Sequence, residues 1–200
     1  MHDGFVSVTD AVPDAVLDIR YAGTYNFVGE PIDGYGAHRA LLTREAASAL
    51  SRAADAFRRD GYRIVVYDAY RPQRAVDHFV RWAGTPDEHM RAAFYPDLDK
   101  GVLFARGYIA RRSGHTRGST IDLTLCRMDG ESVDMGGSFD FFGPVSAHGA
   151  AGITALQAAN RAYLCGVMEE NGFRRYDEEW WHYTLAGEPY PDTYFDFPIA

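Results

Sequence analysis

The stretch SGHTRGSTIDLTL, residues 113–125, decides the fold because it changes from a polar, glycine-punctuated loop into an alternating strand. Successive side chains of a strand point to opposite faces, so the isoleucine and two leucines share one face and Asp122 and Thr124 share the other. The apolar face predicts a core strand over residues 119–126. Asp122 is then expected to point out of the core into a cleft, close to the loop that carries His115.

Outward from this strand, hydrophobic periodicity, caps and turn residues predict the other elements. Helices are predicted over residues 41–61 (N-cap Thr43), 72–83 (Pro72 in the first turn) and 154–170. Strands are predicted over residues 62–68, 173–176 and 180–185, the last two forming a hairpin. A second hairpin is predicted through Asp129-Gly130, and residues 84–107 and 134–152 are predicted to be irregular. Strands and helices do not alternate regularly, which favours an α+β fold with a small, mainly antiparallel sheet flanked by helices.

The composition limits the classes of function. The formal net charge is −8 and no block of basic residues occurs, which argues against a nucleic-acid partner. No run approaches the roughly 20 apolar residues of a membrane span, and the acidic N-terminus MHDGFVSVTDAVPDAVLDIRY does not resemble a signal peptide. Without repeats or linkers, residues 1–200 are expected to form a single cytoplasmic domain. Cys126 and Cys165 show neither metal-site nor disulfide spacing and are expected to be free thiols.

Two of the seven histidines stand out. The familiar HExxH, GxSxG, Walker and complete GxGxxG motifs are absent from the sequence. His115 lies in the loop before Asp122, whereas His182 lies in the aromatic strand EEWWHYTL, where an imidazole needs a polar partner. The other five are expected to be exposed or hydrogen-bonded surface residues: His2, His38, His78, His89 and His148.

His115, Asp122 and His182 would make a three-ligand zinc site with an open fourth position, as catalytic zinc sites have. Such a site also needs a carboxylate that is not a ligand to carry protons, and Glu179 is the candidate. In a regular strand, however, residues three apart face opposite sides. Glu179 therefore requires a bend before Trp180. From the spacing alone, a structural His–Asp pair remains the alternative.

Arg71 is the second candidate for catalysis. It lies in YDAYRP, residues 67–72, between a buried strand and a helix that begins with proline. One interpretation is a rigid donor for a developing oxyanion or a substrate carboxylate. The other is a structural arginine paired with Asp68.

Together, YDAYRP, SGHTRGSTIDLTL and EEWWHY resemble the zinc D-alanyl-D-alanine dipeptidases of the VanX type. The pattern S-x-H-x-x-G-x-x-x-D followed by E-x-x-H is typical of a wider superfamily with lysostaphin-type peptidases, D-Ala-D-Ala carboxypeptidases and hedgehog domains. The stretches NFVGEPIDGY (26–35), DMGGSFDFF (134–142) and EPYPDTYFDFP (188–198) resemble the dipeptidase branch. The resemblance thus covers nearly the whole chain, although the loop GPVSAHGAAG (143–152) is plainer than the family pattern.

This resemblance implies a hedgehog/DD-peptidase-like fold and hydrolysis of the D-Ala-D-Ala dipeptide by metal-activated water. It implies one Zn²⁺ per chain, held by His115, Asp122 and His182, with Glu179 as general base and acid. It further implies that Arg71 stabilises the tetrahedral intermediate. The residues implied to line the substrate pocket are Ser113, Tyr21 and Asp140, the last two near the substrate's ammonium group.

Three rival functions are weaker on this sequence. A cell-wall D,D-carboxypeptidase or endopeptidase would act on larger peptidoglycan peptides outside the membrane and would need export. A zinc-bearing binding domain would not need both Glu179 and Arg71, and a structural zinc would favour four closed ligands, often thiolates. The sequence leaves open whether the chain forms a homo-oligomer, and whether its role is glycopeptide resistance or D-alanine catabolism.

Overall fold

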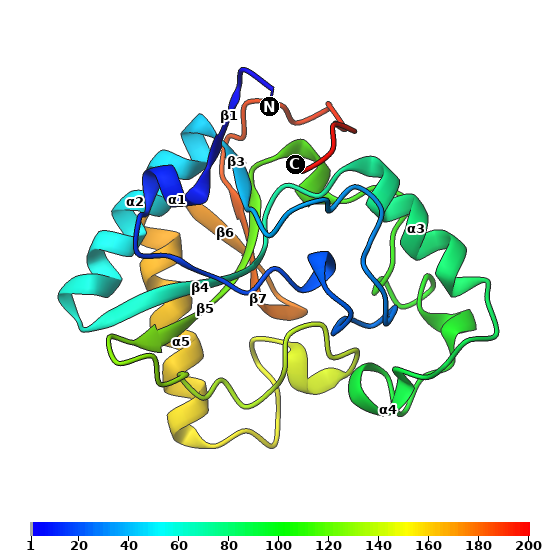
Figure 1. Ribbon diagram of the computed structural model, residues 1–200. Coiled ribbons are helices and arrows are strands. Elements are labelled where there is room, and N and C mark those ends of the chain that lie inside the picture. Colours follow the sequence, from blue (N-terminus) through cyan, green and yellow to red (C-terminus); the bar gives the residue numbers. More distant parts are fainter. Residues whose placement is uncertain (1) are drawn as a thin grey trace.

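The computed structural model describes residues 2–200, and a five-stranded sheet lies at its centre (Figure 1). In spatial order its strands are β2 (Val16–Leu17), β4 (Tyr62–Asp68), β5 (Thr120–Arg127), β7 (Glu179–Leu185) and β6 (Phe173–Tyr176). Only the β2–β4 pair is parallel among these described strands; the other three pairs are antiparallel. A separate two-stranded sheet joins β1 (Phe5–Ser7) to β3 (Leu41–Thr43). The predicted α+β class with a mainly antiparallel sheet is confirmed.

Three helices of more than ten residues surround the central sheet. Helices α2 (Arg44–Arg59) and α5 (Ala155–Glu170) pack on one side of the sheet, and α3 (Gln73–Ala83) lies on the other side with the long loops (Figure 1). The remaining helical pieces are one turn long: α1 (Val8–Ala11), η1 (Arg20–Ala22), α4 (Arg91–Phe94), η2 (Lys100–Val102), η3 (Gly114–Arg117) and η4 (Pro144–Ser146).

The helix starts follow the expected caps, with two corrections. Thr43 caps α2 by accepting a hydrogen bond from the Ala46 amide, but the predicted helix start at residue 41 was wrong. Residues 41–43 pair with β1 instead, because they are buried and extended. Pro72 is the extended N-cap of α3 rather than a residue of its first turn. Thr154 and Gln157 form a capping box that fixes the start of α5.

Strand positions also agree with the sequence to within a residue or two. Strand β5 covers 120–127 instead of 119–126, and β7 begins at Glu179 instead of Trp180. The turn at Asp129-Gly130 exists, but its second arm forms only the isolated bridge between Cys126 and Ser132. Strand β6 matches its predicted range.

The two faces of β5 are both covered, which the alternation alone did not indicate. Ile121, Leu123 and Leu125 are fully buried as expected, yet Asp122 and Thr124 on the opposite face are only 2% and 5% exposed. The second face therefore lies beneath the loops on the α3 side. Asp122 is a buried carboxylate in a cavity wall, not a group in an open cleft.

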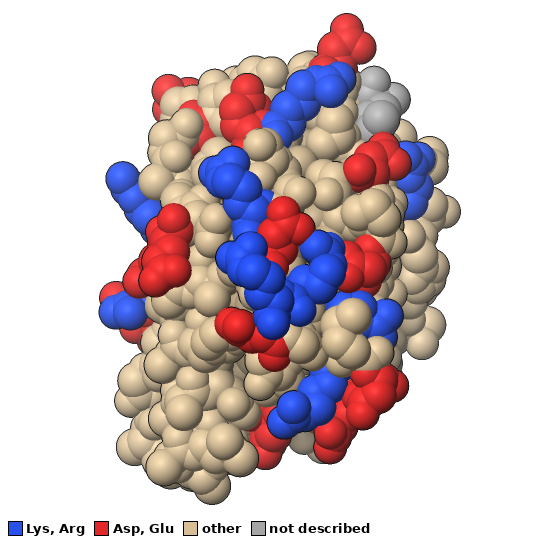
Figure 2. All heavy atoms as spheres, turned by 90° about the vertical axis from the view of Figure 1, so that its left-hand side faces the viewer, with Lys and Arg blue, Asp and Glu red and all other residues tan. Residues whose placement is uncertain are grey.

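On the side of the molecule that carries α2 and α5, basic and acidic side chains are interspersed (Figure 2). On α2, for example, Arg58 pairs with both Asp14 and Asp55. Both cysteines are free and buried, as predicted. None of the helices within residues 2–200 has the length and apolar character needed to span a membrane.

Candidate active site

Three neighbouring strands place a row of polar side chains on one face of the sheet. In the register of the sheet, Asp122 of β5 lies opposite Asp68 of β4 on one side and His182 of β7 on the other. Directly opposite residues of adjacent strands point to the same face and lie close together. The pairing register thus places Asp122 beside His182, two of the three predicted zinc ligands.

His115 reaches this row from the η3 turn. The turn is fixed at its start by the Ser113 hydroxyl, which accepts a hydrogen bond from the His115 amide. It ends at Gly118, where φ is +83° and a Cβ atom would lie 2.2 Å from the Phe5 ring. His115 Nδ1 lies 2.7 Å from the Ala69 carbonyl oxygen, and because a carbonyl only accepts, Nδ1 carries the proton. Nε2 therefore carries a lone pair, as a metal-ligating imidazole nitrogen must.

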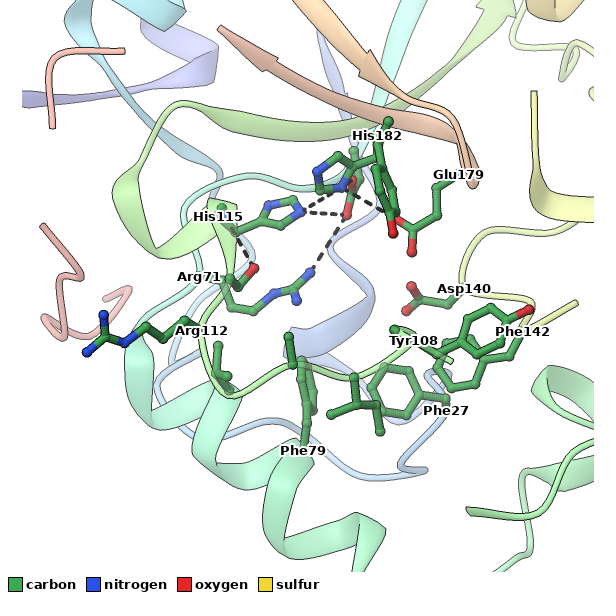
Figure 3. Close-up of a pocket in the computed structure, with 18 of the residues that line it drawn as sticks. Phe27, Arg71, Phe79, Tyr108, Arg112, His115, Asp140, Phe142, Glu179 and His182 are labelled. Atoms are coloured by element: carbon green, nitrogen blue, oxygen red, sulfur yellow. Dashed lines mark hydrogen bonds and ion pairs between the residues drawn. The ribbon is translucent and has the colours of Figure 1, made fainter. Parts of the chain in front are cut away.

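The three predicted ligands converge as a tetrahedral zinc site requires. His115 Nε2 lies 3.3 Å from His182 Nδ1 and 3.2 Å from Asp122 Oδ2, and His182 Nδ1 lies 3.0 Å from Asp122 Oδ1 (Figure 3). Zinc–nitrogen bonds of about 2.0–2.1 Å at tetrahedral angles separate ligand atoms by about 3.3 Å. Asp122 Oδ1 is buried, and within residues 2–200 no group, His182 Nδ1 at 3.0 Å included, meets it with the geometry of a hydrogen bond. Among residues 2–200 this is the one set of at least three such side chains with metal-site spacing.

Glu179 lies beside this cluster, and an irregularity in β7 explains how. The pairing register between β6 and β7 shifts at this point. The adjacent residues Arg175 and Tyr176 of β6 pair with Tyr183 and Glu179 of β7, which are four residues apart. A turn at Asp177–Glu178 precedes β7, as predicted, and a further departure from regular pairing lies between Glu179 and Tyr183. Glu179 Oε2 thereby lies 3.4 Å from His182 Nδ1. Burial raises the pKa of Glu179 to about 7, although His182 opposes the shift. A carboxyl group with this pKa is suited to taking up and returning a proton near neutral pH.

Arg71 lines the cavity and pairs with Asp68, so the predicted pairing with Asp68 is confirmed, while its role as a donor to the substrate stays a prediction. Its Nε and Nη2 each lie 2.9 Å from Asp68 Oδ2, and the other Asp68 oxygen accepts a hydrogen bond from Tyr35 at 2.6 Å. The guanidinium also stacks over the Tyr21 ring at 4.9 Å. With Asp68 1% exposed, this is a rigid, buried support for Arg71.

The far end of the cavity carries a third carboxylate, after Asp122 and Glu179. Asp140 is 7% exposed and accepts a hydrogen bond of 2.6 Å from the Tyr21 hydroxyl. Burial raises the pKa of Asp140 well above its ordinary value, while the Tyr21 hydrogen bond opposes the shift. Asp140 has no ion pair with any of the residues 2–200, so its carboxylate faces the cavity without a cationic partner (Figure 3).

The structure brings every sequence-predicted site residue to one cavity of about 220 Å³. These eight residues are Tyr21, Arg71, Ser113, His115, Asp122, Asp140, Glu179 and His182. The pairing of Asp68 with Arg71 was one of the two interpretations that the sequence offered, and it is confirmed. Sequence reasoning missed Tyr35 as the partner of Asp68 and the aromatic wall formed by Phe27, Tyr108, Phe142 and Tyr176. A carboxylate at the end of the apolar strand YRIVVYD was the available signal for Asp68.

Known proteins resemble this chain over its full length. Residues 1–200 match a peptidase family, M15, described as D-Ala-D-Ala dipeptidase. A D-alanyl-D-alanine dipeptidase of Streptomyces coelicolor is 46% identical over 202 residues, and one of Enterococcus faecium is 44% identical over 201 residues, with 100% of both chains covered in each case.

Among solved structures, a vancomycin-resistance D,D-pentapeptidase VanY variant in complex with Zn(II) aligns with a TM-score of 0.46 and 17% identity, covering 78% of each chain. At this level the structural likeness carries no argument of its own. The sequence matches are decisive, and they confirm the resemblance seen in the motifs. This chain belongs to the D-Ala-D-Ala dipeptidase family of the M15 metallopeptidases.

Proposed function

We propose that this chain hydrolyses the dipeptide D-alanyl-D-alanine to two molecules of D-alanine with one bound Zn²⁺. The membership of the family and the full-length relatives named for this activity support the substrate. The convergence of two imidazole nitrogens and a carboxylate supports the metal.

In this proposal His115, Asp122 and His182 hold the zinc. A zinc ion in a site with three protein ligands lowers the pKa of its water to about 7 and polarises the carbonyl of the scissile amide. The chain contributes the orientation of its ligands. The Ala69 carbonyl fixes the tautomer of His115 and so leaves the Nε2 lone pair for the metal.

Glu179 carries the proton in the proposed mechanism. One of its carboxylate oxygens takes a proton from the attacking water and delivers it to the amide nitrogen of the leaving D-alanine. Each of these two proton transfers contributes about 10²–10⁴-fold to the rate. Arg71, held rigid by Asp68, donates N–H groups toward the carbonyl oxygen as negative charge develops on it.

The observation that carries the choice of a dipeptide is the buried Asp140 carboxylate, which has no cationic partner among residues 2–200. An ammonium group offsets the cost of burying such a carboxylate, so we assign Asp140 and Tyr21 to the free N-terminus of the substrate. Ser113 lines the cavity next to His115 and is assigned to the substrate backbone. A carboxypeptidase or endopeptidase would have to place an uncharged peptide group against Asp140.

The test compares D-Ala-D-Ala with L-Ala-L-Ala and with a longer peptide that ends in D-Ala-D-Ala, with the zinc content measured in parallel. We expect D-Ala-D-Ala to be cleaved with by far the highest kcat/KM. Equal or better cleavage of the longer peptide would instead identify a D,D-carboxypeptidase or endopeptidase. The cytoplasmic location and any homo-oligomer stay predictions.

A further inference from the structure

Arg161 of α5 is a buried arginine without a carboxylate partner. It is 1% exposed, and it forms no ion pair with any of the residues 2–200. Burial lowers the pKa of Arg161. Burying an unpaired charge is costly, so the contacts of this guanidinium point to a specific task.

Those contacts go to the two ends of one loop. Arg161 Nε donates to the Met135 carbonyl oxygen at 2.6 Å, and Nη1 donates to the Ala147 carbonyl oxygen at 2.8 Å. The guanidinium lies 5.6 Å from the centre of the Trp180 ring. Hydrogen bonds from a charged donor are stronger than neutral ones. Arg161 thereby joins the base of the segment 135–147, which we call the Asp140 loop.

Two neighbours on α5 strengthen the same attachment. Asn160 Nδ2 donates to the Asp134 carbonyl oxygen, and Gln157 Nε2 donates to the Asp134 side chain, both at 2.8 Å. Gln157 also closes the capping box, so its position is fixed by the helix start. The ribbon of α5 runs beside the base of this loop (Figure 1).

At its far end the Asp140 loop holds a backbone conformation that needs support. Asp140 has φ of +59°, and among residues 2–200 it is the one non-glycine residue with positive φ. Such conformations persist only where the surroundings determine them. Here Tyr21 holds the side chain, and the Phe142 amide donates to the Phe94 carbonyl oxygen at 2.7 Å. The Ser146 hydroxyl also donates to the Phe141 carbonyl oxygen within the loop, and Arg161 holds its base.

We propose that Arg161 is a positioning residue that closes the base of the Asp140 loop and so fixes Asp140 for the substrate's ammonium group. This inference rests on the proposed function of Asp140. It links a helix on the far side of the sheet to substrate recognition, without contact between Arg161 and the substrate.

The test uses Arg161→Lys, which keeps the charge but cannot bridge two carbonyls in the fork geometry of arginine. The expected result is a rise in KM for D-Ala-D-Ala of about tenfold, the effect of weakening one hydrogen bond to a charged group, with kcat within about threefold of the wild type. Asn160→Ala removes an exposed contact of the same base and should give a smaller rise in KM, so the test survives if Arg161→Lys does not fold. Glu170→Gln, exposed at the end of α5, is the matched control and should change neither parameter.

Hydrogen exchange of the same variants gives a readout that does not depend on activity. Amides of 135–147 should exchange faster in Arg161→Lys, while those of β4 and β5 keep wild-type protection. Unchanged KM with unchanged exchange in this loop would overturn the proposal, and so would a loss of protection spread over the whole sheet. A wild-type protein inactive on D-Ala-D-Ala would refute the proposed function instead, while the exchange data would still decide whether Arg161 holds the loop.

Discussion

Replacing Asp68 by asparagine tests whether the buried support of Arg71 matters for catalysis. The substitution keeps the size of the side chain and one oxygen that accepts from Tyr35. It places an amide donor, or a neutral oxygen, where the carboxylate now meets Arg71 Nε and Nη2 at 2.9 Å. Arg71 would lose its charged partner and would no longer be held at one orientation.

The magnitude follows from the burial of this pair. Asp68 is 1% exposed and the Arg71 side chain 13% exposed, and removal of one partner of a buried ion pair costs about 3–5 kcal/mol. Loss of the negative charge also relieves repulsion with Asp122, so we expect about 3 kcal/mol of lost unfolding free energy. A misplaced oxyanion donor lowers kcat by about 10²–10³-fold. The zinc ligands are untouched, so the metal content should stay at one per chain.

Urea unfolding, steady-state hydrolysis of D-Ala-D-Ala and zinc analysis together provide the assay. The matched control is Asp55→Asn, which removes an exposed partner of Arg58, where a pair contributes about 0–1 kcal/mol. If Asp68→Asn keeps kcat within about twofold of the wild type while binding zinc normally, the assigned role of the Asp68–Arg71 pair is wrong.

Three further outcomes are expected. Glu179→Gln should lower kcat at least about 10³-fold, because it removes both proton transfers, and zinc analysis should still find a full complement. Asp122→Ala should abolish zinc binding along with activity, and metal retained at the wild-type level would contradict its role as a ligand. Burial, reinforced by Arg175, lowers the pKa of His148 to about 4, so its contribution to stability is complete above about pH 6.5 and is lost as the pH falls toward 4. Between pH 7 and pH 5, His148→Phe should lose about 1 kcal/mol less unfolding free energy than the wild type, a small difference because the ring is partly exposed. Urea unfolding at both pH values measures this difference, and an equal loss in both proteins would exclude the contribution of His148.

The sequence predicted the parts of the site that local pattern controls. The alternation around Asp122 fixed which face of β5 it occupies, and the isolated imidazole of His182 in an aromatic strand indicated a polar partner. Their direct pairing across β5 and β7 depends on register, which only the folded sheet defines. The family motifs supplied what periodicity could not, above all Asp140, whose position depends on a long loop with no repeating pattern.

Other features lay beyond local pattern because distant segments decide them. Residues 41–43 have the apolar character of the helix that follows, and only their pairing with β1 makes them a strand. Glu179 faces His182 because β7 departs from regular geometry after it, and the residue spacing alone argued against that contact. Asp68 was visible as a possible partner of Arg71, but its place in a row with Asp122 and His182 required the register of three strands.

The most direct test of the central claim is a zinc titration of the metal-free protein, followed by hydrolysis of D-Ala-D-Ala. The proposed site predicts no activity without metal and a linear recovery that ends at one zinc per chain, held by His115, Asp122 and His182. Hydrolysis by the metal-free protein, or a fully zinc-loaded protein that leaves D-Ala-D-Ala intact, would contradict it.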